Sequence, residues 1–179
     1  MLALKHTVDP ANVPEAAAPG ETPSQYVVRL AREKASDVAK RNEGALVIGG
    51  DTVVVRGGEI IEKPLGSEDA VRMLSGLSGN DHQVYSGLAL VGPDRRVVSE
   101  AAVARVRFRQ VSDADIRAYV ATGEPLDKAG AYGIQGLGSA LVESIDGDYF
   151  TVVGLSVALL VRLLEELGYC YRFGRLVPR

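Results

Sequence analysis

The sequence has little cysteine and little histidine, the residues that most often mark disulfides, metal sites and nucleophilic catalysis. Cys170 is the single cysteine among 179 residues, which excludes an internal disulfide and a multi-cysteine zinc site. His6 and His82 are too few and too far apart in sequence to indicate a metal site or a Ser/His/Asp triad. Such sparse cysteine is typical of a reducing compartment, so we expect a cytoplasmic protein.

Strong charge imbalance and long apolar runs are lacking as well. The 20 basic and 23 acidic side chains leave a formal net charge of −3, so bulk charge does not favour binding to a nucleic acid polymer. The charge-free stretch Tyr149–Val161 is well short of the roughly 18 apolar residues that a membrane span needs. The N-terminal residues show no apolar secretory segment. We therefore expect neither a membrane nor a nucleic acid partner, and an anionic ligand would need locally clustered cations.

The composition is that of a globular domain, with 46% hydrophobic and 24% charged residues. Helices are predicted at about 22–41, 67–76, 112–123 and 155–167, and strands at 45–48, 52–55, 59–62, 82–91 and 97–109. Gly49-Gly50 is expected to break the first strand, and Asp146-Gly147 to join two further strands, 140–145 and 149–153, as a hairpin. This order predicts a mixed α/β fold rather than a regular βαβ repeat.

Lys34 lies on the apolar stripe of the first predicted helix, together with Val27 and Leu30. An ammonium group that faces a dry core pays a large desolvation cost unless an anion offsets it. One interpretation is a lysine at the edge of the stripe whose ammonium group reaches water. The other is an ammonium group aimed into a cleft, where it meets an anion.

Asp51 follows a buried strand and two glycines, whose missing side chains let a ligand or another backbone approach closely. A carboxylate at this position can bind a divalent cation or accept a proton from water. The alternative is a turn aspartate that hydrogen-bonds its own backbone. Lys63 precedes Pro64, which favours an extended backbone, and the simplest interpretation of Lys63 is a solvated surface lysine.

The glycine-rich stretch 123–138 lacks the Gly-Lys-Ser/Thr of a phosphate-binding loop and the third glycine of a dinucleotide fingerprint. Its backbone amides could cradle a ligand, and its polar candidates are Asp127, Lys128 and Gln135. Gln135, with one acceptor and two donors, is suited to read a nucleobase edge. The alternative is a flexible loop.

Six segments carry a more specific signal than any single residue: YVVRLAREKA (26–35), GGDTVVV (49–55), GEIIEKP (58–64), LSGNDHQVYSG (77–87), GEPLDKAGAYGIQGLG (123–138) and GDYFTVVGL (147–155). Together they resemble the Maf family of nucleoside triphosphate pyrophosphatases, over about residues 8–167. The resemblance implies an inosine-triphosphatase-like α/β fold, in which helices flank a mixed twisted sheet and two lobes surround a central cleft. A single Maf-like domain would then occupy residues 1–173.

The resemblance also implies an enzyme, a nucleotide diphosphatase that hydrolyses a nucleoside triphosphate between its α and β phosphates and uses Mg²⁺ or Mn²⁺. Asp51 resembles the family's proton acceptor, which would activate the attacking water. Lys34 and Lys63 resemble the lysines that hold the phosphates. Glu15 aligns with an acidic residue in the loop before the helix, so Asp51 and Glu15 are the implied metal ligands.

The substrate implied by the resemblance is dTTP or UTP, with modified pyrimidine nucleotides as further candidates. Thr52 and Gln135 occupy positions that go with dTTP and UTP rather than 7-methyl-GTP in the branch with the segment DKAGAYGIQG. Asp127 and Lys128 belong to the same branch pattern. Clustered lysines with a cation agree with this substrate class, because a net-acidic protein must neutralise a triphosphate locally.

Both ends of the chain depart from the family pattern. Family members open with a strand and a Ser-x-Ser-Pro-Arg-Arg motif whose arginines clamp phosphates, and this segment is absent from the sequence. We therefore expect weak activity, and we expect an exposed sheet edge to favour a homodimer. The last four residues, Leu176–Arg179, match the remnant of a thrombin-cleavage linker, so residues 174–179 are interpreted as an expression tail.

Two alternative functions stay open at this point. One is a nucleotide-binding regulator of septum formation and cell division, which would bind dTTP with little turnover. The other is hydrolysis of inosine or xanthosine triphosphate, which shares the expected fold but not the DKAGAYGIQG segment.

Overall fold

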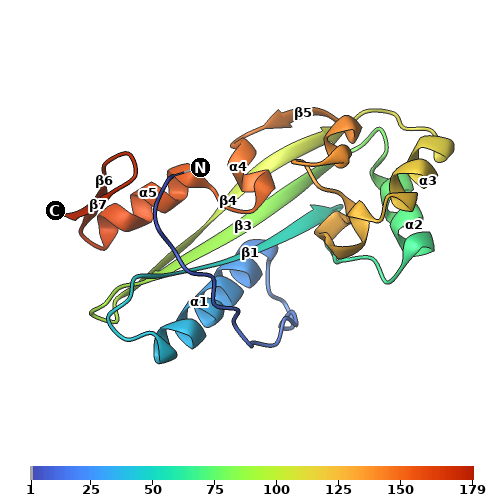
Figure 1. The fold of residues 1–179 in the computed structure, drawn as a ribbon. Helices are drawn as coiled ribbons and strands as arrows, with labels where there is room; N and C mark the ends of the chain where they lie inside the picture. The colour runs from blue at the N-terminus through green and yellow to red at the C-terminus, as the bar shows by residue number, and fades with distance from the viewer. Residues whose placement is uncertain (1) are drawn as a thin grey trace. The chain divides into compact units, whose positions relative to one another are not determined.

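Five strands form one sheet, in the order β2-β1-β3-β4-β5, in the computed structural model, which describes residues 2–179 (Figure 1). The strands are β1 (Val47–Arg56), β2 (Glu59–Ile61), β3 (Asp81–Val91), β4 (Val97–Phe108) and β5 (Val142–Asp146). β2 pairs antiparallel with β1, and β5 pairs antiparallel with β4. Together with the helices, this sheet confirms the mixed α/β fold predicted from the sequence.

The chain divides into two compact units, and β1, β3 and β4 each contribute residues to both. The first unit contains residues 2–51, 86–102 and 155–179. The second unit contains residues 52–85 and 103–154. Among the described residues, two hydrophobic clusters lie in the first unit and one lies in the second.

Helix α1 (Pro23–Arg41) opens the regular structure of the first unit. The Thr22 side chain accepts a hydrogen bond from the Gln25 amide, and the Gln25 side chain accepts one from the Thr22 amide. This capping box and the proline in the first turn fix the start of the helix. The apolar stripe confirms the predicted helix. It buries Val27, Leu30, Ala31, Ala35 and Ala39.

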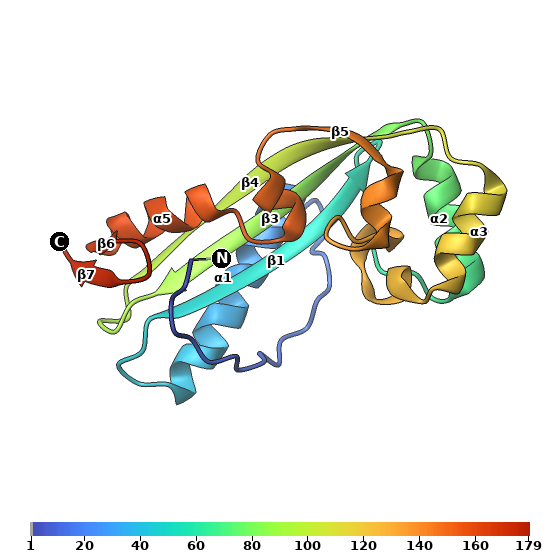
Figure 2. The ribbon, with the colours of Figure 1, turned by 45° about the horizontal axis from the view of Figure 1, so that its top comes forward.

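Strand β3 separates two helical layers within the first unit. Ala89 and Val91 pack with the alanines of α1, whereas Leu88 and Leu90 pack with the leucines of α5 (Val157–Glu166). Alternate residues of a strand point to opposite faces. α1 and α5 therefore cover opposite faces of this part of the sheet, as Figures 1 and 2 show.

Gly49 explains how closely α1 lies to β1. A Cβ atom at this position would overlap the carbonyl oxygen of Ala31 and lie 2.8 Å from Ala35 Cβ. The expectation that Gly49-Gly50 breaks the strand is wrong, because β1 runs through both glycines. The missing side chain of Gly49 serves the close approach of a helix rather than a turn.

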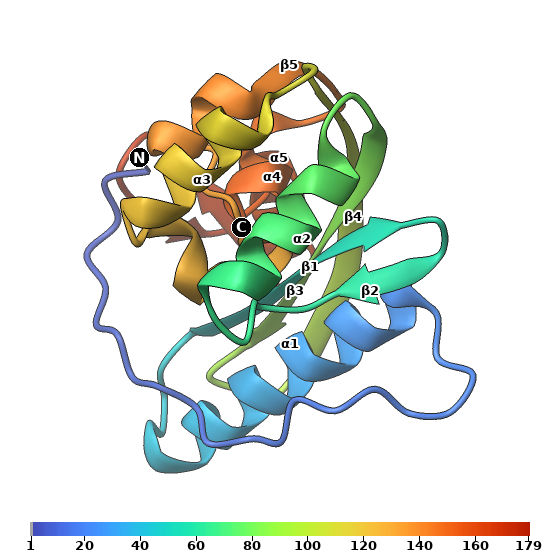
Figure 3. The same ribbon diagram turned by 90° about the vertical axis from the view of Figure 1, so that its right-hand side faces the viewer.

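In the second unit, α2 (Ser67–Leu77) and α3 (Asp113–Ala121) lie side by side, as Figure 3 shows. Leu74 and Ile116 pack in one cluster with Phe108 of β4. Both helices confirm their predictions. The glycine-rich stretch that follows α3 forms three short 3₁₀ helices: η1 (Glu124–Asp127), η2 (Ala129–Ala131) and η3 (Leu137–Leu141).

Residues 149–153 form a short helix, α4 (Tyr149–Val153), and not the predicted strand. Asp148 caps this helix, since its Oδ1 accepts a hydrogen bond from the Phe150 amide and its Oδ2 accepts one from the Thr151 hydroxyl. The predicted hairpin is therefore wrong, and β5 pairs with β4 instead. The next helix, α5, confirms its prediction.

The last residues form a small antiparallel pair, β6 (Tyr169–Tyr171) with β7 (Leu176–Pro178), which the sequence analysis did not predict. The interpretation of residues 174–179 as an expression tail stays a prediction. Among residues 2–179, no helix is long and apolar enough to cross a membrane.

Candidate functional site

Lys34 forms two ion pairs in the first unit. Its Nζ lies 2.7 Å from Asp51 Oδ1 and 2.6 Å from Glu15 Oε1. The Lys34 side chain is 21% exposed and that of Asp51 is 9% exposed. Of the two interpretations of Lys34, the structure therefore supports an ammonium group that meets anions rather than one that reaches only water.

Small residues at a helix–strand crossing bring these groups together. Ala35, the neighbour of Lys34, packs against Gly49, and Asp51 lies two positions beyond Gly49 in β1. Residues two apart in a strand share a face, so Asp51 points to the same side of β1 as Gly49, toward α1. Because Asp51 lies inside a strand, the interpretation as a turn aspartate is wrong.

The charge on Lys34 is stabilised by its partners. Burial lowers the pKa of Lys34, but the hydrogen bonds to Asp51 and Glu15 raise this pKa by more, so that it lies above its usual value. Lys34 is therefore a cation throughout the neutral pH range.

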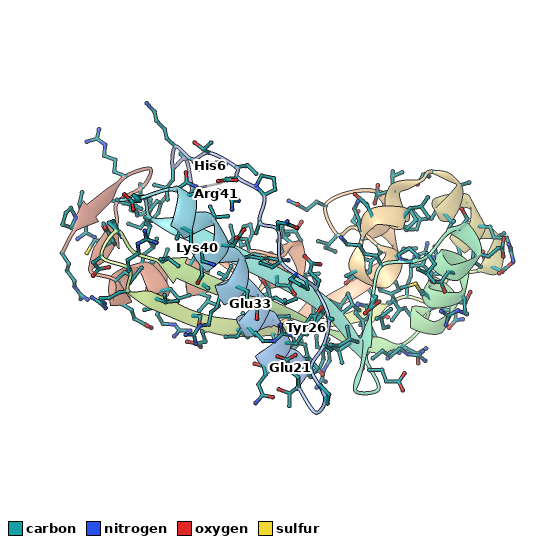
Figure 4. The ribbon with its side chains drawn as sticks, turned by 90° about the horizontal axis from the view of Figure 1, so that it is seen from below. His6, Glu21, Tyr26, Glu33, Lys40 and Arg41 are labelled. Carbon is teal, nitrogen blue, oxygen red and sulfur yellow. The ribbon has the colours of Figure 1, made fainter. Side chains whose placement is uncertain are left out.

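Residues 9–21, here called the strap, carry Glu15 and run beside α1 (Figure 4). Arg41 of α1 holds one end of the strap through Asp9. Its Nη2 lies 2.8 Å from Asp9 Oδ1, and its Nε lies 3.0 Å from Asp9 Oδ2. Two parallel charge-assisted hydrogen bonds of this kind fix geometry as well as supplying energy.

Arg29 holds the other end of the strap through Glu21. Its Nε and Nη2 each lie 2.7 Å from one oxygen of Glu21, and Nη2 also donates to the carbonyl oxygen of Ala16 at 2.9 Å. The hydrogen bonds from Arg29 lower the pKa of Glu21 to about 2. This clamp is not among the contacts predicted from the sequence. The i, i+4 spacing of Arg29 and Glu33 was a local signal, but the contact with Glu21 depends on the path of the strap.

Asp51 and Glu15 fit a divalent cation by the chemistry of their donors. Carboxylate oxygens are hard ligands, and proteins often hold Mg²⁺ through one or two carboxylates together with substrate phosphates. Both carboxylates contact the same Lys34 Nζ, so their oxygens face a common point. Within residues 2–179, no group of three or more His, Cys, Asp or Glu side chains is arranged to hold a metal ion. A cation bound here would therefore need further ligands from a substrate or water.

The second unit contains a pocket of about 280 Å³. Four residues that the sequence analysis singled out line it: Thr52, Lys63, Lys128 and Gln135. Valine, isoleucine and tyrosine side chains and the backbone of the glycine-rich stretch supply most of the remaining wall. These residues are Val54, Val84, Ala129, Tyr132, Gly133, Ile134, Gly136, Val152 and Val153. A concave, largely apolar wall with a few polar groups is the usual form of a small-molecule site.

Asp127 is the one predicted residue of the second unit that does not line this pocket. Its Oδ1 accepts a hydrogen bond of 2.7 Å from Lys128 Nζ, and this contact lowers the pKa of Asp127. Lys128 Nζ also donates to the carbonyl oxygen of Glu124 at 3.0 Å. Asp127 therefore restrains Lys128 at the pocket wall, while Lys63 at the same wall is exposed.

Tyr132 of the pocket wall belongs to a buried aromatic cluster. The Tyr132 hydroxyl lies 2.9 Å from His82 Nε2, and both rings stack edge-on with Phe108. Burial lowers the pKa of His82 to about 4 and raises the pKa of Tyr132, so both groups are neutral at neutral pH. From the sequence, His82 is only an isolated histidine, and nothing singles out Tyr132.

The sequence is similar to one protein family along nearly its whole length. A family profile described as "Maf-like protein" matches residues 1–167. A dTTP/UTP pyrophosphatase of Koribacter versatilis is 48% identical over 161 residues, which cover 90% of this chain and 83% of that protein. A dTTP/UTP pyrophosphatase of Gloeobacter violaceus is 54% identical over 159 residues, or 89% of this chain and 83% of that protein. A dTTP/UTP pyrophosphatase of Clostridium perfringens (strain 13 / Type A) is 51% identical over 144 residues, which cover 79% of this chain and 75% of that protein.

Proposed function

Because the chain belongs to the Maf family, we propose that it is a nucleoside triphosphate pyrophosphatase that hydrolyses dTTP and UTP to the monophosphate and pyrophosphate. The names of its relatives support the substrate class. The observation that carries the proposal is the position of Lys34 Nζ between Asp51 and Glu15. In this arrangement a carboxylate can accept a proton from water, and the ammonium group beside it can neutralise charge on a phosphate.

In the proposed reaction, Asp51 accepts a proton from the attacking water, and the phosphoanhydride bond between the α and β phosphates breaks to release pyrophosphate. Asp51 must be ionised to act as this base. The 2.7 Å hydrogen bond from Lys34 favours the ionised form. Catalysis of displacement at phosphorus depends mainly on positioning of the substrate and neutralisation of its charge. Lys34 and Lys63 are proposed to supply both.

A divalent cation, Mg²⁺ or Mn²⁺, is part of the proposal. Asp51 and Glu15 would hold it, and when bound it would neutralise charge on the triphosphate. The strap gives Glu15 its place beside Lys34 through the clamps at Arg29 and Arg41.

We assign recognition of the base to the pocket of the second unit. The Gln135 side chain offers one acceptor and two donors, which suits the edge of thymine or uracil. Thr52 adds a hydroxyl group, and Tyr132 adds apolar and aromatic surface. Asp127 is proposed to act through Lys128, whose ammonium group it binds.

The proposal includes a cytoplasmic location and a homodimer. The single cysteine supports a reducing compartment. The two edge strands of the sheet, β2 and β5, have backbone groups that a second copy can pair with, which supports the homodimer. Size-exclusion chromatography with light scattering tests the oligomeric state, and a monomer would contradict this part.

The test of function is release of pyrophosphate from a panel of nucleoside triphosphates, with Mg²⁺ and with Mn²⁺, by the wild type and by Asp51→Asn. We expect release from dTTP and UTP by the wild type and none from the variant, with unchanged circular dichroism. Glu43→Gln is the matched control, since Glu43 is a highly exposed carboxylate whose removal should leave turnover unchanged.

Two outcomes would contradict the proposal. Turnover retained by Asp51→Asn would remove Asp51 from its role as the base. Binding of dTTP in calorimetry without release of pyrophosphate would favour a nucleotide-binding regulator instead of an enzyme.

A further inference from the structure

The carboxylate of Glu124 binds three groups in the second unit. Its Oε2 accepts a hydrogen bond from the Leu137 amide at 2.9 Å, and its Oε1 accepts one from the Gly138 amide at 3.0 Å. The Tyr119 hydroxyl donates to the same Oε1 at 2.9 Å. Hydrogen bonds to an ionised acceptor are roughly twice as strong as those between neutral groups. Glu124 is therefore a strong anchor for the backbone at 137–138.

Tyr119 extends this anchor to the other end of the segment. Tyr119 belongs to α3 and is buried. Its hydroxyl group accepts a hydrogen bond from the Gly133 amide at 3.2 Å. The backbone of 133–138 is thus tied at its first residue to Tyr119 and at its last two residues to Glu124. Gln135 lies between the two ties, and its side chain is exposed, so its direction depends on this backbone.

The glycines of the segment make room for the two side chains. A Cβ atom at Gly136 would lie 2.5 to 2.6 Å from the carboxyl atoms of Glu124, and one at Gly138 would lie 2.6 Å from the Tyr119 hydroxyl. Real Cβ atoms are not found at such distances from their neighbours. A side chain at Gly136 would therefore displace the Glu124 carboxylate, and one at Gly138 would meet the Gly133 backbone, at 2.8 and 2.9 Å, as well as the Tyr119 hydroxyl.

The protonation states agree with these ties. Burial raises the pKa of Glu124, but the hydrogen bonds from Gly138, Leu137 and Tyr119 lower it by more, so that it lies below its usual value. Burial also raises the pKa of Tyr119 well above its usual value. At neutral pH the ionised Glu124 carboxylate therefore accepts hydrogen bonds from the protonated Tyr119 hydroxyl and from two backbone amides.

We propose that Glu124 and Tyr119 are positioning residues that hold segment 133–138 so that Gln135 faces the base, and that they thereby determine discrimination between pyrimidine and purine triphosphates. This inference rests on the proposed function of the pocket. Neither side chain lines the pocket, so both act through the backbone that they tie.

The test compares Tyr119→Phe and Glu124→Gln with the wild type. The phenylalanine keeps the ring but loses both hydrogen bonds of the hydroxyl group. The glutamine keeps the size but turns an acceptor into a donor toward the backbone amides. We expect the ratio of kcat/KM for dTTP to that for GTP to fall about tenfold in each, the change that loss of one or two such hydrogen bonds gives.

Tyr171→Phe is the matched control, because the Tyr171 hydroxyl donates to a backbone carbonyl of the first unit, that of Leu2. It should leave the dTTP-to-GTP ratio unchanged. A fall in Tm in Tyr119→Phe with an unchanged ratio would show a merely structural role and would overturn the inference.

Hydrogen exchange separates failure of the inference from failure of the proposed function. We expect the amides of Gly133, Leu137 and Gly138 to exchange at least about tenfold faster in the two variants, whether or not the protein hydrolyses dTTP. Unchanged exchange at these amides would overturn the inference even if the wild type is an active pyrophosphatase. If the wild type does not hydrolyse dTTP but exchange is faster in the variants, the proposed function is wrong, and so is the role of Glu124 and Tyr119 in discrimination. Their hydrogen bonds to segment 133–138 would still be confirmed.

Discussion

The Lys34 cluster and the pocket are built from different kinds of interaction. Around Lys34, charge meets charge: one ammonium group contacts two carboxylates, and arginines clamp the strap that supplies Glu15. In the second unit, Tyr132 of the pocket wall and its partner His82 are buried and neutral. Removal of a charge and added salt should therefore weaken the Lys34 cluster, whereas protonation of His82 should destabilise the second unit.

Lys34→Met should have the largest effect, because it removes the cation from the charged cluster. We expect kcat/KM for dTTP to fall about 10²- to 10³-fold, the loss typical of one preorganised electrostatic group. The free energy of unfolding should fall by about 2 kcal/mol, since the partly buried carboxylate of Asp51 loses a hydrogen-bond donor. Steady-state kinetics and urea unfolding measure the two effects.

The control for Lys34→Met is Lys40→Met, which removes an exposed lysine from the last turn of the same helix (Figure 4). Its kcat/KM should stay within about twofold of the wild type. Equal losses in the two variants would mean that net charge, and not the contact with Asp51, is responsible.

Acid should destabilise the second unit through His82. Burial holds the pKa of His82 at about 4 in the folded chain, against 6.5 when it is free in solution. The unfolded chain therefore takes up a proton first as the pH falls. The contribution of His82 to stability is complete above about pH 6.5 and declines between pH 6.5 and 4, by a total of about 3 kcal/mol.

Urea unfolding of the wild type and of His82→Asn at pH 7.5, 5.5 and 4.5 isolates this effect. The variant is expected to be less stable at pH 7.5, and the stability gap between the two proteins should narrow toward pH 4.5. If the difference in free energy of unfolding between the two proteins does not change with pH, His82 is not held neutral in the folded chain.

Gly49→Ala should disturb the crossing of α1 and β1 and so separate packing from charge in the first unit. The added Cβ atom would overlap Ala31 and Ala35, and overpacking of this kind costs about 2 kcal/mol. Calorimetric Tm measures the loss. Gly66→Ala is the control, since a Cβ atom there meets nothing within 4 Å, and an equal loss in both would contradict the close-approach explanation.

Salt should have the smallest effect, and it should act on the strap more than on segment 133–138, whose ties include backbone amides. Exposed ion pairs are worth less than about 1 kcal/mol and are screened at high ionic strength. We expect limited proteolysis within residues 9–21 to quicken severalfold between about 0.05 and about 1 M NaCl. Hydrogen exchange of segment 133–138 should stay constant, and a parallel change in both segments would remove the distinction between them.

Local patterns predicted the helices of this fold well. The helices predicted at about 22–41 and 112–123 are present as α1 and α3, and each begins at a side-chain cap that acts within one turn, Thr22 or Ser112. The strand at 149–153 was predicted wrongly because an apolar run of five residues fits a strand or a helix, and the cap at Asp148 decided between them.

The candidate residues were found by their unusual positions, but their partners were not. A lysine on an apolar stripe and an aspartate after two glycines could each be singled out from the sequence. The contact between Lys34 and Asp51 depends on how far α1 can approach β1, and Glu124 gave no sequence signal because its partners are backbone amides. Such contacts arise from the fold and leave no periodicity to read.

The strap gives Lys34 an internal competitor. Glu15 already occupies one side of the ammonium group, so an incoming anion gains only the difference between its own attraction and that of a carboxylate. An anion with a single charge should therefore gain little by this exchange, whereas a polyphosphate, which carries several charges, should gain more. We therefore expect small monovalent anions to compete poorly for Lys34.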